Sequence, residues 1–210
     1  MTDGTGVSEA GVGPQGSAQG RGTTTDLHTD ALRLLTTWRA TSEEADLARQ
    51  RAVQVLADGP VAMTRAHRPG HVTASALVVG PDGRVLLCLH GRLGKWMQLG
   101  GHCEPGDRTL AAAALREATE ESGVAGLTLD PDPIDVDVHA VRCTPAQGLP
   151  AEPGTHYDVR FLVRSPAGAI ERVSAESTAL AWFPADALPS PLAPATARQI
   201  ALALGRLRSP

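Results

Sequence analysis

The chain has 210 residues with a formal net charge of −4, and 42% of them are hydrophobic. This length allows one domain with extensions and a substantial core, and the charge argues against a nucleic-acid-binding surface. No stretch is long and apolar enough to cross a membrane, and the N-terminus lacks a secretory pattern. The three cysteines are too few and wrongly spaced for a disulfide framework or a zinc site. We therefore expect a cytoplasmic protein with no membrane or nucleic-acid partner.

The N-terminal third is predicted to be a disordered tail followed by two helices. Residues 1–24 are rich in Gly, Ser and Thr, and this composition cannot offset the entropy lost on ordering. Apolar residues at helical spacing predict a helix over Asp26–Arg39. A second helix follows, with Thr41 and Glu44 as a capping box. Residues 25–68 are thus expected to form a helical extension that packs on the main domain and is a candidate contact for a homodimer.

The rest of the chain alternates predicted strands with two long helices, which indicates an α+β fold. In chain order we predict a hairpin of Val72–Val79 and Arg84–His90, a helix over Thr109–Ser122, strands at Ile134–Cys143, Tyr157–Arg164 and Leu180–Phe183, and a helix over Ala193–Leu207. A loop rich in Pro and Gly is expected at Gly148–Thr155. This division places the main domain at 69–190 and a C-terminal helix within 191–210.

The chemistry-bearing motif is a glycine-rich loop that runs into the first helix of the main domain. The loop reads Gly-Gly-His-Cys-Glu-Pro-Gly-Asp over 100–107, and the helix carries Arg-Glu-Ala-Thr-Glu-Glu over 116–121. Because residues three and four apart share a helix face, Glu117, Glu120 and Glu121 project together. Three like charges on one face call for a cation, and Mg²⁺ is usually held by a few carboxylates together with substrate phosphates. The residues themselves therefore predict a metal site for a phosphorylated substrate.

This motif resembles the signature of the Nudix hydrolases, which cleave nucleoside diphosphates linked to another group. The family pattern is Gly, five residues, Glu, seven residues, then Arg-Glu-apolar-x-Glu-Glu-x-Gly-apolar. The matching positions are Gly101, Arg116, Glu117, Ala118, Glu120, Glu121, Gly123 and Val124. Asp107 departs from the pattern, because it stands where the first Glu is expected and because eight residues, not seven, separate it from Arg116. The extra residue falls at the loop-to-helix junction, so the departure puts a role for Asp107 in doubt and leaves the glutamates unaffected.

The resemblance extends to a bacterial subgroup with a Gly-Gly-His-x-Glu-x-Gly-Asp loop and an N-terminal helical extension. It implies a Nudix α/β/α sandwich with a mixed β-sheet and the hydrolysis of a phosphoanhydride bond, with Mg²⁺ or Mn²⁺ as cofactor. The implied metal ligands are Glu117, Glu120, Glu121 and Gly101. The implied catalytic residues are Glu117, Glu120 and Arg116, with Glu117 as ligand or base and the arginine orienting a glutamate through an ion pair.

The expected partner is a small-molecule nucleotide. Lys95 precedes the signature loop and His102 follows its double glycine, so both are candidates to contact this substrate. The alternative interpretations are a solvated lysine and a structural histidine. Weaker candidates for the site are Glu104, Glu176, Trp96, His90, His139 and His156, and Cys103 is interpreted as a half-buried filler of the loop.

Two other functions compete with hydrolysis at this point. A Nudix scaffold can bind a nucleotide as a sensor without cleaving it, although the intact glutamate cluster argues against this alternative. An isopentenyl diphosphate isomerase shares the fold class, but its chemistry needs a dedicated Cys and Glu that Cys103 does not supply convincingly. The substrate itself stays open among ADP-ribose, nucleotide sugars, dinucleoside polyphosphates and oxidised nucleoside triphosphates, because specificity lies in loops outside the signature.

Overall fold

A computed structural model describes residue 1 and residues 23–144, 149–174 and 177–208. Its helices are α1 (Thr24–Thr37), α2 (Glu43–Leu56), the short 3-10 helix η1 (Pro60–Met63), α3 (Leu110–Ser122) and α4 (Pro194–Arg208). Its strands are β1 (Gly70–Val79), β2 (Val85–His90), β3 (Lys95–Met97), β4 (Leu99–His102), β5 (Thr128–Leu129), β6 (Asp135–Cys143), β7 (Glu152–Arg164) and β8 (Ser177–Phe183). Among the described residues, every helix is too short or too polar to cross a bilayer.

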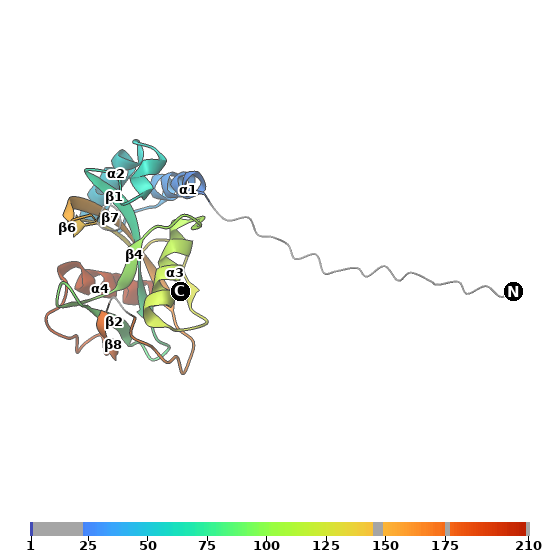
Figure 1. Cartoon of the computed structure of the whole chain (residues 1–210). Coiled ribbons are helices and arrows are strands. Elements are labelled where there is room, and N and C mark those ends of the chain that lie inside the picture. Colours follow the sequence, from blue (N-terminus) through green and yellow to red (C-terminus); the bar gives the residue numbers. More distant parts are fainter. Residues whose placement is uncertain (2–22, 145–148, 175–176, 209–210) are drawn as a thin grey trace.

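The strands form one mixed sheet with β1 at its centre. β1 runs antiparallel to β2 and β4 and parallel to β7, while β7 also pairs with β6 and β5, and β2 pairs with β3 and β8. Figure 1 shows α3 and α4 on either side of the central strands, with α1 and α2 together at one end. The α+β class, the mixed sheet and the helical extension are thereby confirmed.

The two faces of β1 pack against different layers, because side chains alternate along a strand. Val72, Ala74, Ala76 and Val78 belong to the core shared with α1, α2 and α3. On the opposite face, Leu77 and Val79 pack with α4. The same face carries His71, Thr73 and Ser75, which are buried polar residues. Polar groups therefore line the first half of this face and apolar groups its second half.

Helix capping in the extension differs from the prediction. Ser42 is the N-cap of α2, and its hydroxyl accepts a backbone N–H of the first turn, so the capping box predicted at Thr41 and Glu44 is wrong. A capping box is present instead at α1, between Thr23 and Asp26. Ser42 has the same N-cap chemistry as its neighbour Thr41, so sequence spacing alone did not distinguish the two positions.

The loop predicted over Gly148–Thr155 is shorter than expected. β7 begins at Glu152, because its first residues pair antiparallel with the end of β6, where Cys143 lies opposite Glu152. This pairing overrides the local Pro and Gly content, since a partner strand supplies the hydrogen bonds that propensity does not. Residues 145–148 and most of the predicted tail, 2–22, lie outside the described residues.

Candidate active site

The signature helix α3 is closely packed against the sheet. The hydroxyl of Thr109 caps its N-terminus by accepting the N–H of Ala112 at 3.0 Å, and Gly123 ends it with a left-handed φ of 64°. Its buried face includes Ala113, Ala114 and Ala118, whose small side chains allow the helix to approach β1 closely. The glutamates therefore project near the double glycine of β4.

Two of the glutamates contact the double glycine directly. Glu121 Oε2 accepts the N–H of Gly100 at 2.9 Å. Gly100 has φ of 143°, and a Cβ there would lie 2.4 Å from the Cα of Ser75, so this position requires glycine. A Cβ at Gly101 would lie 2.8 Å from Glu117 Oε1. Gly101 therefore leaves the space that the Glu117 carboxylate occupies, and Gly100 lets β4 lie close against β1.

Arg116 connects the glutamates to the signature loop. It donates two hydrogen bonds to buried Asp107, at 3.1 and 3.0 Å, and one to the carbonyl of His102 at 2.9 Å. Its Nη1 donates to Glu117 at 3.2 Å and to Glu120 at 3.0 Å. Burial alone would lower the pKa of Arg116, but the hydrogen bonds to Asp107 and the charges of Glu117 and Asp107 raise it above its ordinary value. Asp107, whose role was in doubt from the motif alone, anchors this arginine.

The glutamate cluster offers a donor set that suits a hard divalent cation. Its donors are carboxylate oxygens, which Mg²⁺ and Mn²⁺ prefer over nitrogen and sulfur. Glu120 is the most accessible of the three, with 60% of its side chain exposed, whereas Glu117 is 15% exposed. The absence of a side chain at Gly101 leaves open space beside the Glu117 carboxylate, which any larger residue would fill. Glu117, Glu120 and Glu121 therefore fit the cation that the sequence predicted.

The other predicted site residues have different surroundings. Lys95 begins β3, at the edge of the sheet, with an exposed side chain opposite His90. Glu104 is exposed in the signature loop, and Glu176 lies outside the described residues. Trp96 stacks edge-on against Phe183 in the core on the α4 side.

His102 belongs to a histidine cluster on the α4 side of the sheet. Its ring centroid lies 5.1 Å from that of His71 and 4.9 Å from that of His156. Cys143 Sγ lies 3.2 Å from His102 Nε2, and His139 flanks His156. From the sequence we expected His90, His102, His139 and His156 to converge; His90 instead lies opposite Lys95, and His71 and Cys143 were missed. The signal that could have found His71 is strand parity, since 71, 73 and 75 are polar residues on one face of a buried strand.

Burial shifts the pKa values of this cluster. Desolvation, followed by the positive charge of Arg68, lowers the pKa of His71 to about 4. Desolvation, followed by the charge of Arg65, lowers the pKa of His102 to about 2. Desolvation, followed by the charge of His71, lowers the pKa of His156 to about 3. The imidazoles are therefore neutral near pH 7.

A buried charge network continues along the same face. Arg160 donates to Asp158 at 2.9 Å and to Asp137 at 3.0 Å. Asp158 also accepts hydrogen bonds from the hydroxyls of Thr73 and Ser75 at 3.1 and 2.8 Å. The strand register brings these charged and hydroxyl side chains together, because the pairing of β7 with β1 and β6 places them opposite one another. These polar groups form a line between the histidines and the apolar core beneath α4.

The network predicts that the protein loses unfolding free energy as the solution becomes strongly acidic. Burial alone would raise the pKa of Asp137, but the hydrogen bond from His139 and the charges of Arg160 and Arg198 lower it from 3.8 to about 2. A depressed carboxyl pKa contributes stability above the unfolded value, and that stability is lost as the pH falls toward 2. We expect about 2 kcal/mol of unfolding free energy to disappear over this window. Urea unfolding across the window should show a shallower decline for Asp137→Asn, and equal slopes would contradict the assignment.

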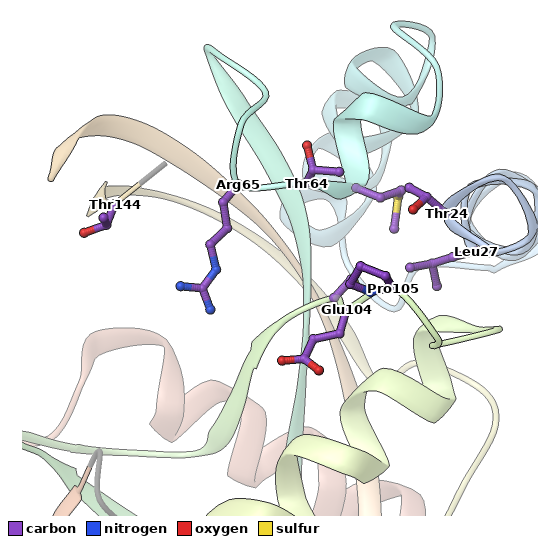
Figure 2. Close-up of a pocket in the computed structure, with 9 residues that line it drawn as sticks. Thr24, Leu27, Thr64, Arg65, Glu104, Pro105 and Thr144 are labelled. Atoms are coloured by element: carbon purple, nitrogen blue, oxygen red, sulfur yellow. The ribbon is translucent and has the colours of Figure 1, made fainter. Parts of the chain in front are cut away.

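A pocket separates the helical extension from the signature loop (Figure 2). It has a volume of about 660 Å³, and Thr24, Leu27, Met63, Thr64, Arg65, Cys103, Glu104, Pro105 and Thr144 line it. Figure 2 shows the guanidinium of Arg65 and the carboxylate of Glu104 reaching into the same space. The extension thus supplies one wall of the pocket, and the loop that precedes α3 supplies the other.

Comparison with known proteins places the chain in a family. The NUDIX domain model matches residues 69–203. No curated protein matches the sequence. Similar solved structures include a NUDIX-family hydrolase from Clostridium perfringens (23% identity, TM-score 0.49, covering 66% of this chain and 98% of that one). A MutT NUDIX hydrolase from Burkholderia pseudomallei is also similar (29%, 0.47, 62% and 95%), as is the NUDIX domain of Shewanella oneidensis NrtR complexed with ADP ribose (22%, 0.49, 68% and 92%). The assignment rests on the family model, which covers most of the chain: the protein belongs to the NUDIX family and is a Nudix hydrolase.

Proposed function

We propose that the protein hydrolyses a phosphoanhydride bond in a nucleoside diphosphate-linked substrate, using a divalent cation held by Glu117, Glu120 and Glu121. One observation carries this proposal: α3 brings Glu117 and Glu121 against the double glycine, where Gly101 leaves room for Glu117 and the Gly100 N–H holds Glu121. When bound, Mg²⁺ would supply positive charge to phosphate oxygens and make a water more acidic. The domain itself is proposed to span 69–190, with 25–68 as the extension and 191–210 as the C-terminal segment.

The roles of the residues follow from their contacts. Glu121 is held by the N–H of Gly100 and Glu117 by Arg116, so both carboxylates are oriented before a substrate arrives. Preorganised charges stabilise a transition state without reorganising during the reaction. Glu120 is the most exposed of the three, so it is the carboxylate best placed to meet an incoming cation and water. Arg116 acts through the glutamates as a positioning residue.

The pocket beside the signature loop supports a place for the substrate. Arg65 is a permanent cation in its lining, and an arginine fork matches the geometry of phosphate oxygens. Glu104 faces it from the loop that precedes the glutamate helix, as Figure 2 shows. We infer that part of the nucleotide enters this pocket, with the helical extension contributing to its recognition.

Turnover of a substrate panel tests the proposed function. The panel contains ADP-ribose, a nucleotide sugar, a dinucleoside polyphosphate and an oxidised nucleoside triphosphate, each assayed with Mg²⁺ and with EDTA. We expect nucleotide or phosphate release from at least one compound, with Mg²⁺ only. Tight stoichiometric binding of a compound without release would instead support a sensor, and release that is unchanged in EDTA would contradict the cation's role.

Gly101→Ala tests the contact between the strand and Glu117. The new Cβ would lie 2.8 Å from Glu117 Oε1, so the carboxylate must shift. Since misplacing a reacting group by about 1 Å can cost roughly a hundredfold, we expect kcat to fall by about 10- to 100-fold. Gly205→Ala is the matched control, because a Cβ there meets no atom within 4 Å. Equal kcat values for the two variants would show that the space at Gly101 is not needed.

A further inference from the structure

We propose that His71, His102, Cys143 and His156 form a four-ligand site for a borderline-soft divalent metal ion of the Zn²⁺ class, separate from the glutamate cluster. The four residues come from β1, β4, β6 and β7, so only the folded sheet brings them together. The proposal concerns metal binding by these side chains and does not depend on the proposed hydrolysis.

The geometry of the four side chains fits a single ion. One ligand atom from each residue lies within 4.8 Å of all the others. A tetrahedral Zn²⁺ with nitrogen and sulfur ligands at their usual bond lengths separates neighbouring ligand atoms by about 3.3–3.6 Å. His102 Nε2 and Cys143 Sγ are already 3.2 Å apart, and Sγ lies 4.0 Å from His71 Nε2. The other separations, none of them above 4.8 Å, would have to shorten to complete the tetrahedron.

The burial of the cluster leaves polar atoms that need a partner. His71 is fully buried and Cys143 is 6% exposed. His156 Nε2 is buried without a hydrogen-bond partner among the described residues. Buried polar groups in folded proteins are nearly always satisfied, and exceptions call for an explanation such as an ion. A bound metal ion would satisfy His156 and would use the short contact between His102 and Cys143.

The donor chemistry selects the metal. Three imidazoles and one thiolate contain no oxygen donor, so the set suits Zn²⁺ and disfavours Mg²⁺. The thiolate is needed for charge balance, because Arg68 donates to the backbone carbonyl of Cys143 at 3.4 Å and adds positive charge nearby. Glu152 lies 3.5 Å from Arg68 and offsets part of that charge. The affinity of the site for the ion should therefore depend strongly on the Cys143 thiolate.

His139 is close to the cluster but outside the ligand set. Its ring centroid lies 5.6 Å from that of His156, and its Nδ1 forms a hydrogen bond of 2.8 Å with the carboxylate of Asp137. Ligation of His102, by contrast, would tie β4 to the paired ends of β6 and β7. Because Gly101 precedes His102, the same bond would fix the strand that borders Glu117. The ion would thus have a structural effect on the strand beside the glutamates.

Cobalt titration of the metal-stripped full-length protein tests the site. Co²⁺ is the probe, because it replaces Zn²⁺ and gives strong visible absorption in a tetrahedral site and a charge-transfer band when a thiolate binds it. We expect one Co²⁺ per chain with both signals, displaced by Zn²⁺ and retained in excess Mg²⁺. Cys143→Ser should abolish the charge-transfer band and weaken binding by at least about a hundredfold, since even outer partners of a metal site contribute tenfold or more.

Three controls separate this site from other sources of binding. His139→Gln changes the neighbouring histidine, and Cys88→Ser changes another buried cysteine, so both should keep the signals. Glu120→Gln should keep them as well, whether or not the protein hydrolyses nucleotides. If Cys143→Ser is unfolded by circular dichroism, His156→Ala provides the second test. Absence of both signals in the wild type, or their retention in a folded ligand variant, would overturn the proposal.

Discussion

Glu120→Gln is expected to lower metal-dependent turnover by roughly 10²- to 10³-fold, the range seen when one preorganised charge is removed from a transition state. The substitution keeps the shape of the side chain and removes its negative charge. Because 60% of the Glu120 side chain is exposed, the fold should tolerate the change, with stability altered by no more than about 0.5 kcal/mol. The loss should therefore lie in catalysis and not in folding.

The measurement compares kcat and KM for wild type and Glu120→Gln on whichever compound the panel identifies. Glu43→Gln is the matched control, because Glu43 is an exposed glutamate in the first turn of α2. We expect this control to retain wild-type kcat and Glu120→Gln to lose it while denaturing at a similar urea concentration. Full turnover by Glu120→Gln would remove Glu120 from the proposed cation site.

Arg160→Met is expected to destabilise the protein by about 3–5 kcal/mol, the usual effect of removing one partner from a buried ion pair. Arg160 is buried and pairs with Asp158 and Asp137, and its loss leaves Asp158 without its cation, whereas Asp137 keeps Arg198. Burial alone would raise the pKa of Asp158, but the charge of Arg160, followed by that of His139, lowers it below its ordinary value. Removing the arginine takes away the largest cause that lowers this pKa, so the buried Asp158 carboxylate loses its main stabilising partner.

Urea unfolding measures this loss, with Arg164→Met as the matched control. Arg164 ends the same strand but is exposed, so its substitution should change stability by no more than about 0.5 kcal/mol. A double variant with Asp158→Asn should recover part of the loss, because it removes the stranded charge. Equal midpoints for Arg160→Met and Arg164→Met would show that the network contributes little.

The sequence predicted most of the elements that position the glutamate cluster. The periodicity of apolar residues placed α3 correctly to within one residue at its start, since Thr109 proved to be the N-cap. The Nudix-like spacing indicated that the three glutamates and Arg116 belong to one site. In the structure, Arg116 donates hydrogen bonds to Glu117 and Glu120. These are local relations along one helix, where spacing in sequence determines spacing in the fold.

The histidine cluster was largely hidden because it depends on strand register. His71 and His156 lie 85 positions apart in the sequence, and the parallel pairing of β1 with β7 places them side by side. Cys143 joins them from the end of β6, a position that no local pattern indicates. The expectation that three cysteines exclude a zinc site considered their spacing alone and left out histidines from other strands. Asp107 was likewise unassigned because its partner is nine residues further along the chain.

Binding of Mn²⁺, followed by the electron paramagnetic resonance signal of the free ion, tests most directly whether the glutamates hold the catalytic cation. Mn²⁺ prefers oxygen ligands, so the histidine and cysteine cluster should not compete for it. Wild type and Cys143→Ser should bind Mn²⁺ alike, and Glu120→Gln should bind it at least about tenfold more weakly. Wild-type affinity in Glu120→Gln, with loss of binding in Cys143→Ser, would show that Mn²⁺ binds at the histidine and cysteine cluster and not at the glutamates.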